Sequence, residues 1–385
     1  MLAAVTVNLM AVLPLFLTGA MAVQIGRDFN VSPASVAILS SLFAVATMVG
    51  SAPLGRRVGQ WGVRRSLRLS ALIAACALLL AAVSPAIPLL GFALLVGGCA
   101  NALGQPAGNA LVAAQVSPAR FGLGFAIKQS GIPLATLLGG LAVPLVALPL
   151  GWRSTYLLAA VGVVGAMLLV PADMTRYPGR SESAVPSSLR KPLWLLAVSV
   201  SAAVIAATSI GALGAAGGVE VGFSESAAGY LVAAGGLAGL VVRLGSGVLA
   251  DRLPFDSLHA MAALCVLGAL GWMAMATDSI AAYAVGLVVA NAFGWGWPGL
   301  QHLAVARRFP TSTAAASGVS QTGVAVGLLV GPAILGLVAG AVGWSWVWLV
   351  AASAALVGAA GVWFAAARIP VPGIADFGAS RPRRR

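Results

Sequence analysis

Charged residues are scarce in this sequence of 385 residues. Only 8% of the residues are charged, whereas 60% are hydrophobic. About 25% of the residues in a soluble globular domain are charged, so this composition excludes a soluble globular protein. The sequence therefore predicts a protein that lies in a membrane.

Acidic residues are missing from the interior of the long apolar segments. The nine acids all fall at segment ends or in the polar stretches between segments: Asp28, Asp173, Glu182, Glu220, Glu225, Asp251, Asp256, Asp278 and Asp376. An acid in the middle of a membrane segment is costly and usually has a function, such as holding a cation. Its absence argues against a cationic substrate.

Histidine, cysteine and catalytic motifs are also scarce. The two histidines, His259 and His302, do not belong to a cluster with metal-ligand spacing. No glycine-rich phosphate loop with a lysine is present. The three cysteines, Cys76, Cys99 and Cys265, lie in apolar segments, so we expect free thiols. We expect no enzyme activity, no metal and no cofactor.

The apolar residues form twelve segments, each long enough for the roughly 20 residues that span a bilayer as a helix. We expect helices at about 3–24, 33–55, 67–83, 87–114, 121–148, 152–172, 192–216, 226–249, 258–276, 279–305, 314–341 and 343–367. The stretch between the sixth and seventh is rich in Pro, Ser, Arg and Glu, which is typical of a linker. The expected divisions are an N-terminal six-helix bundle (1–172), a cytoplasmic linker (173–191), a C-terminal six-helix bundle (192–368) and a basic tail (369–385).

The basic residues show which side faces the cytoplasm. Of the 22 Lys and Arg residues, all but Arg27 and Arg153 fall on one side of these segments. Basic residues concentrate on the cytoplasmic side, so we expect both termini there, in a bacterial plasma membrane. The net charge of +13 then favours contact with anionic lipid, and we expect no nucleic-acid partner.

The two halves repeat one another. The offset of 192 residues that separates Pro106 from Pro298 recurs at other landmarks without a gap. The further pairs are Gly104 with Gly296, Gln129 with Gln321, Gly131 with Gly323, Gly139 with Gly331, and Gly151-Trp152 with Gly343-Trp344. The chain is therefore a duplication of about half its length.

The stretch Gly247 to Arg252 resembles the loop signature between helices eight and nine of the major facilitator superfamily. Its copy, at the same offset, is the stretch that starts at Gly55. The resemblance implies an all-α membrane protein of twelve helices in two six-helix bundles related by a pseudo-twofold axis. It assigns a gating motif to Gly55, Gly59, Gly62, Arg64, Gly247, Asp251 and Arg252. Gly59 departs from the family pattern, because it stands where an Asp is usual.

Two basic residues, Lys128 and Arg243, lie inside apolar segments. One interpretation is an anion site, with Arg as a planar fork for a carboxylate and Lys as a point charge. Alternatively, Lys128 extends to the membrane surface, and Arg243 pairs with a loop acid or with helix carbonyls. Arg243 stands four residues before Gly247, which resembles the helix-eight arginine of monocarboxylate transporters and the oxalate–formate antiporter.

Neutral polar residues complete the candidate binding site. Asn101, Gln105 and Asn109 share one helix face, and Asn291, Trp295 and His302 share another. The full set adds Gln129, Gln321 and Asn8. Hydrogen bonding between helices is the alternative role for the amides, and packing is the alternative for Trp295. His302 is either a proton-coupling residue or an interfacial one.

These features predict a secondary transporter that works by alternating access. We expect a small organic anion, such as a monocarboxylate, as the substrate, with coupling to protons, and we expect a monomer. The first alternative is an efflux transporter for amphipathic drug-like compounds. The second is a membrane sensor that transports nothing.

Overall fold

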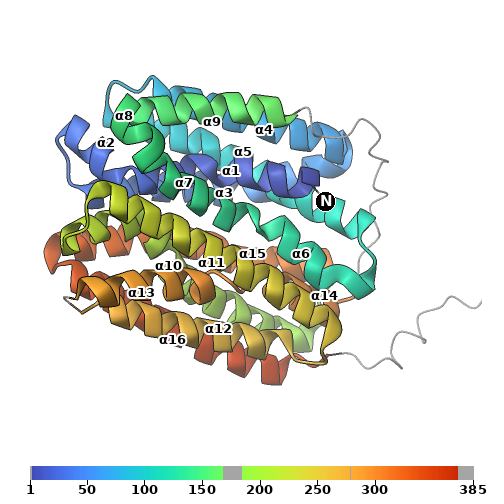
Figure 1. Ribbon diagram of the computed structural model, residues 1–385. Coiled ribbons are helices and arrows are strands. Elements are labelled where there is room, and N and C mark those ends of the chain that lie inside the picture. The colour runs from blue at the N-terminus through green and yellow to red at the C-terminus, as the bar shows by residue number, and fades with distance from the viewer. Residues whose placement is uncertain (1, 168–183, 278, 372–385) are drawn as a thin grey trace, which may run out of the picture.

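The apolar segments fold as helices, since only a helix pairs all its backbone hydrogen bonds within one membrane segment. A computed structural model describes residues 2–167, 184–277 and 279–371 (Figure 1), and within these ranges it contains helices and no strand. The N-terminal half contains α1 (Leu2–Ala20), α2 (Ala22–Phe29), α3 (Pro33–Trp61), α4 (Val63–Ala82), α5 (Ile87–Gln115), η1 (Pro118–Arg120), α6 (Phe121–Gln129), α7 (Gly131–Ala142), η2 (Val143–Ala147), α8 (Leu148–Leu150) and α9 (Trp152–Ala166). The C-terminal half contains α10 (Ser187–Val221), α11 (Glu225–Arg252), α12 (Ser257–Met275), α13 (Ile280–Gly294), α14 (Pro298–Arg308), α15 (Thr313–Ala341) and α16 (Trp344–Arg368).

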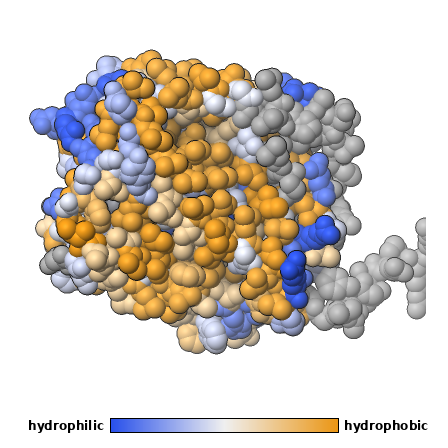
Figure 2. All heavy atoms as spheres, in the orientation of Figure 1, coloured by the Kyte–Doolittle hydropathy of each residue, from blue (hydrophilic) through white to orange (hydrophobic). Residues whose placement is uncertain are grey.

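The helices have the length and surface of membrane spans. Ten of the described helical stretches are long and apolar enough to cross a membrane, and α1 with α2 makes an eleventh that is bent by 63°. Figure 2 shows a broad hydrophobic surface with hydrophilic residues gathered at its two ends. An all-helical, multi-pass membrane fold is therefore confirmed. The count of twelve spans stays a prediction, because α9 borders residues outside the described ranges.

The two halves form two bundles that pack along α1 and α10, α3 and α15, and α7 and α11. In Figure 1 the N-terminal helices occupy the upper part and the C-terminal helices the lower part. Glycine allows the closest approach: a Cβ on Gly19 would lie 1.8 Å from the carbonyl oxygen of Gly211. In lipid the hydrophobic effect does not drive helices together, so close van der Waals packing at small residues stabilises such crossings instead. The expected linker and tail lie largely outside the described residues, so those boundaries stay predictions.

Three of the expected continuous helices are broken. The first bends at Met21, the fifth is interrupted at Ser130, and the tenth ends at Gly294 and resumes at Pro298. Pro298 stands at the first position of α14, where its missing backbone N–H costs nothing. The expectation that Asn291 and His302 share one helix face was therefore wrong.

Two of the expected loops are helical. The helix α3 continues to Trp61, and α11 continues to Arg252, so both copies of the gating motif begin inside a helix. A helix can project past the membrane because its backbone stays paired in water as well as in lipid. The turn that ends α3 falls at Gly62, where φ is 82° and a side chain would be strained.

Candidate functional site

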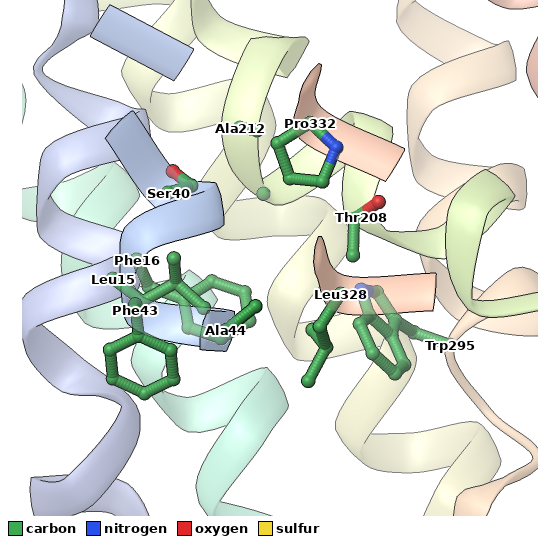
Figure 3. A pocket seen from close by; sticks show the side chains of 11 residues that line it. Leu15, Phe16, Ser40, Phe43, Ala44, Thr208, Ala212, Trp295, Leu328 and Pro332 are labelled. Atoms are coloured by element: carbon green, nitrogen blue, oxygen red, sulfur yellow. The ribbon is translucent and has the colours of Figure 1, made fainter. Parts of the chain in front are cut away.

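An apolar cavity lies between the two halves. Its free space is about 20 Å³, room for about one water molecule, so the cavity is nearly closed in this conformation. Figure 3 shows walls from both halves, with Ser40 and Phe43 on one side and Thr208, Leu328 and Trp295 on the other. The lining residues are Leu15, Phe16, Ser40, Phe43, Ala44, Thr208, Gly211, Ala212, Trp295, Leu328 and Pro332. None of them is charged, so the described wall offers a ligand apolar surface and a few hydrogen-bonding groups.

A buried polar cluster is centred on Asn8 of α1. Its amide donates to the carbonyl oxygen of Lys128 at 2.8 Å and accepts from Gln105 Nε2 at 2.7 Å. The Lys128 ammonium donates to Gln105 Oε1 and, at 3.4 Å, to Gln129 Oε1. Gln105 also donates to Asn101 at 3.2 Å. Lys128 is fully buried, so its side chain does not extend to the membrane surface.

His302 of α14 continues this cluster into the C-terminal half. The amide nitrogens of Gln129 and Gln321, equivalent positions of the two repeats, lie 3.5 Å and 2.8 Å from His302 Nε2, which can accept from them. His302 Nδ1 lies 2.7 Å from the Pro298 carbonyl, which only accepts, so Nδ1 carries a hydrogen. Phe125 stacks on the ring at 5.6 Å. His302 is buried and does not face the membrane surface.

Arg243 of α11 joins the halves through backbone carbonyls. Its Nη1 donates to the carbonyl oxygen of Gln129, and its Nη2 donates to that of Trp295. These carbonyls stand at the C-terminal ends of α6 and α13, where a cation is favoured by the helix dipole. Pairing with helix carbonyls was one of the two interpretations of Arg243, and in this conformation the guanidinium adopts it.

Asn291 stands apart from the cluster. It is fully buried on α13, and neither amide atom has a hydrogen-bond partner among the described residues. It packs against Gly235 and Gly239 of α11, where a Cβ would lie 3.0 Å and 3.3 Å from Asn291 atoms. Of the expected binding residues, Asn8, Asn101, Gln105, Lys128, Gln129, His302 and Gln321 are therefore linked directly, Arg243 and Trp295 through backbone carbonyls, and Asn291 not at all.

Asp251 joins the two halves at the end of the molecule that carries Arg252 and Arg307, here called the basic end. Its two carboxylate oxygens accept from the backbone N–H groups of Gly122 and Leu123, each at 2.8 Å. These are unpaired donors at the start of α6, where the helix dipole favours an acid. Gly247 permits the contact, because a Cβ there would lie 2.4 Å from the Cβ of Ala126. The C-terminal half is thereby attached to the N-terminal half.

The other gating-motif residues make no comparable contact between the halves in the described structure. A Cβ on Gly59 would meet no described atom within 4 Å, and Gly55 faces α5 of its own half. Gly62 forms the turn after α3, Arg252 is exposed, and the Nε atom of Arg64 has no described hydrogen-bond partner. The gating role of the set stays a prediction.

Glu225 closes the opposite end. It is the first residue of α11, and it accepts from Gln24 Nε2 at 2.6 Å and pairs with Arg27. Both partners belong to α2 of the other half. Sequence reasoning missed this pair, although the topology placed Glu225 and Arg27 on the same side. It also missed Ser40, Phe43 and Thr208, because single hydroxyl or aromatic residues in apolar segments give no signal beyond packing.

Comparison with known proteins agrees with this architecture. The family model described as Major Facilitator Superfamily matches residues 4–322. A chloramphenicol resistance protein of Streptomyces lividans is 30% identical over 274 residues, which cover 68% of this chain and 68% of that protein. The helical repeat, the apolar outer surface and these matches lead to one conclusion. The chain belongs to the major facilitator superfamily of membrane transporters.

Proposed function

We propose that this transporter exports a neutral, amphipathic, ring-bearing compound through the cavity between its halves. The observation that carries the proposal is the cavity lining, which is apolar apart from Ser40, Thr208 and Trp295. A charged ligand in such a site would lose its hydration without gaining a counter-charge. A neutral ring with a few polar groups suits these walls better.

The relative supports the same class of compound. The relative's name gives resistance to chloramphenicol, which is an uncharged nitrophenyl compound with hydroxyl and amide groups. Resistance also suggests the outward direction of transport. The substrate proposed here is therefore of chloramphenicol's chemical class.

Alternating access would follow from the contacts at the two ends. Asp251 holds the halves together at the basic end, and Glu225 holds them at the other. Release of one contact while the other stays closed would open the cavity to one side of the membrane at a time. We take the basic end as cytoplasmic, in the plasma membrane of a bacterium.

An organic anion is the second candidate substrate. Two buried bases, Lys128 and Arg243, favour it, because neither forms an ion pair with an acid in the described part of the chain. An anion that entered the polar cluster would neutralise them. His302, which joins the two halves of the cluster, is the candidate for proton coupling in either case.

The test is uptake into everted membrane vesicles under an imposed pH gradient, with labelled chloramphenicol and labelled lactate. We expect chloramphenicol to accumulate. Ala44→Phe, which fills the cavity, should abolish accumulation, while Val49→Phe on the exposed face of the same helix should not. Lactate uptake without chloramphenicol uptake would select the anion instead.

A further inference from the structure

Two buried groups in the cavity wall lack hydrogen-bond partners among the described residues: the hydroxyl of Ser40 and the indole N–H of Trp295. The two side chains belong to residues that are only 2% and 5% exposed. Buried polar groups in native proteins are nearly always paired, because an unpaired one loses water and gains nothing. Each therefore requires an explanation.

Equivalent groups elsewhere in this protein are mostly satisfied. The hydroxyls of Thr18 and Ser84 donate to the carbonyl four residues earlier in their own helices. The indole of Trp272 donates to Ser209 at 2.8 Å, and that of Trp297 donates to Gly294 at 2.7 Å. Thr208, the third polar residue of the cavity wall, donates to the Ile205 carbonyl at 2.9 Å. Among the described lining residues, Ser40 and Trp295 are thus the ones whose buried polar side-chain atom has no hydrogen-bond partner at all.

The two groups stand on opposite walls. Figure 3 shows Ser40 on α3 of the N-terminal half and Trp295 across the cavity in the C-terminal half, at the break between α13 and α14. Phe16 and Phe43 also line this cavity. The space is too narrow for a ring in this conformation, so the two halves would have to move apart before a ring could enter. A ring in the widened cavity would pack on the aromatic side chains, and polar groups at its two ends would reach the two walls.

We propose that Trp295 and Ser40 are the polar anchors of the transported compound. The Trp295 indole only donates, so it selects a carbonyl, nitro or similar acceptor. The Ser40 hydroxyl both donates and accepts, so it pairs with a hydroxyl or amide. The substrate is then a ring with an acceptor on one side and a hydroxyl or amide on the other. This inference rests on the proposed function, because it requires a ligand in this cavity.

Calorimetric titration of the purified full chain in detergent, with two probes of the same shape, tests the Trp295 anchor. Acetophenone carries a carbonyl oxygen, and α-methylstyrene has a methylene group in its place. Trp295→Phe keeps a ring but loses the N–H, so it should weaken acetophenone binding about three- to tenfold. Binding of α-methylstyrene should change less than twofold. Trp348→Phe is the control, since that indole is also buried and unpaired but lies outside the cavity wall.

Chloramphenicol tests the Ser40 anchor in the same assay. Ser40→Ala should weaken its binding about three- to tenfold, whereas Ser41→Ala should not. The Ser41 hydroxyl is likewise unpaired in the described structure but does not line the cavity.

The outcomes separate the two proposals. If the wild-type protein binds none of the three probes, a neutral ring-bearing substrate is wrong, and the anchors are wrong with it. If the probes bind but Trp295→Phe weakens acetophenone and α-methylstyrene equally, or Ser40→Ala behaves as Ser41→Ala does, the anchors are wrong and the neutral substrate stands.

Discussion

At the scale of single residues, Asn8 links three other members of the polar cluster. Its amide nitrogen donates to the carbonyl oxygen of Lys128, and its amide oxygen accepts from the side chain of Gln105. It also lies 3.4 Å from Gln129 Oε1. Loss of a hydrogen bond destabilises a protein most where the remaining partner stays buried without water or another partner. Asn8 is therefore a structural residue in this conformation, whatever else it contacts during transport.

Asn8→Ala should lower the free energy of unfolding by about 1–3 kcal/mol, because it leaves the Lys128 carbonyl and a Gln105 donor unpaired. Equilibrium unfolding in detergent measures the change. Asn109→Ala is the control, since Asn109 Oδ1 has no hydrogen-bond partner in the described part of the chain. Equal losses in both variants would show that the Asn8 bonds contribute little.

The residues of the polar cluster could be predicted, but their partners could not. Gln129, Lys128 and Arg243 stood out because a polar group in an apolar segment is costly unless it is paired. The partners of Arg243 are backbone carbonyls, and these become available only where a helix stops. A sequence does not show that Gln129 and Trp295 stand at such ends.

At the scale of helices, Asp256 caps the N-terminal end of α12. Its side chain accepts from the N–H groups of Leu258 and His259 at the start of α12, and it pairs with Arg308. Burial opposes ionisation of this carboxyl. The hydrogen bond and charge of Arg308, together with the backbone hydrogen bonds from His259 and Leu258, outweigh burial, so the pKa of Asp256 lies below its usual value. A lowered pKa in the folded state means that the ionised form stabilises the fold.

The stabilisation from Asp256 should be complete above about pH 5 and should fall as the pH drops below about 4, through the lowered pKa. Asp256→Asn keeps a capping side chain but removes the charge, so its stability should depend less on pH. Asp256→Ala should cost about 1 kcal/mol more than Asp256→Asn at pH 7, through loss of the cap. Melting curves from pH 3 to pH 7 test both statements. A wild-type curve parallel to that of Asp256→Asn would contradict the role of the charge.

Arg243 donates to carbonyls at two helix ends at once, so a substitution that removes some of its donors should lower the free energy of unfolding. Arg243→Lys replaces a fork by a point charge that serves one carbonyl well. We expect a loss of about 1–3 kcal/mol in unfolding free energy, with chloramphenicol affinity changed less than twofold. Thermal unfolding and ligand titration of the same preparation measure both. Unchanged stability with lost affinity for an organic anion would instead support Arg243 as a substrate ligand.

Helix breaks were the least predictable elements. Pro106 and Pro298 are repeat equivalents, yet Pro106 lies inside the continuous helix α5 and Pro298 begins α14 after a break. The difference lies in the surroundings. A Cβ on Gly294, where α13 ends, would lie 2.3 Å from the ring of Trp272 on a neighbouring helix. Tertiary packing of this kind is invisible in a local pattern.

At the scale of the whole molecule, the two halves are fastened at both ends. Asp251 caps α6 at the basic end, and Glu225 pairs with Arg27 at the other. Most of this architecture was predictable: the internal repeat and the apolar segments indicated two similar helical halves. The two end contacts could not be predicted in the same way. They join residues more than 100 positions apart, which come together only when the two halves pack.

The two fastenings should have opposite effects on the conformational equilibrium. Asp251→Asn weakens the hold on α6 and should favour opening at the basic end. Glu225→Gln removes the pair with Arg27 and should favour opening at the other end. Distances between spin labels across each end would lengthen at the end that carries the substitution and shorten or stay constant at the other.

The double variant provides the control, since it should return the populations toward those of the wild type. If Asp251→Asn leaves the distances across the basic end unchanged, the contact with α6 is not a latch. If both single variants lengthen the same end, the two contacts do not oppose each other.

The buried bases have an electrical consequence. Arg243 keeps its charge in proteins, and both it and Lys128 are enclosed in helices whose described acids lie only at the ends. If rocking carries these two charges across one tenth of the membrane field, a potential of 100 mV contributes about 0.5 kcal/mol. That energy shifts the ratio of the two open states roughly twofold. If the basic end faces the cytoplasm, as proposed, a potential that is negative inside would favour whichever state brings the charges nearer the inside, and the ratio of the two open states would depend weakly on voltage.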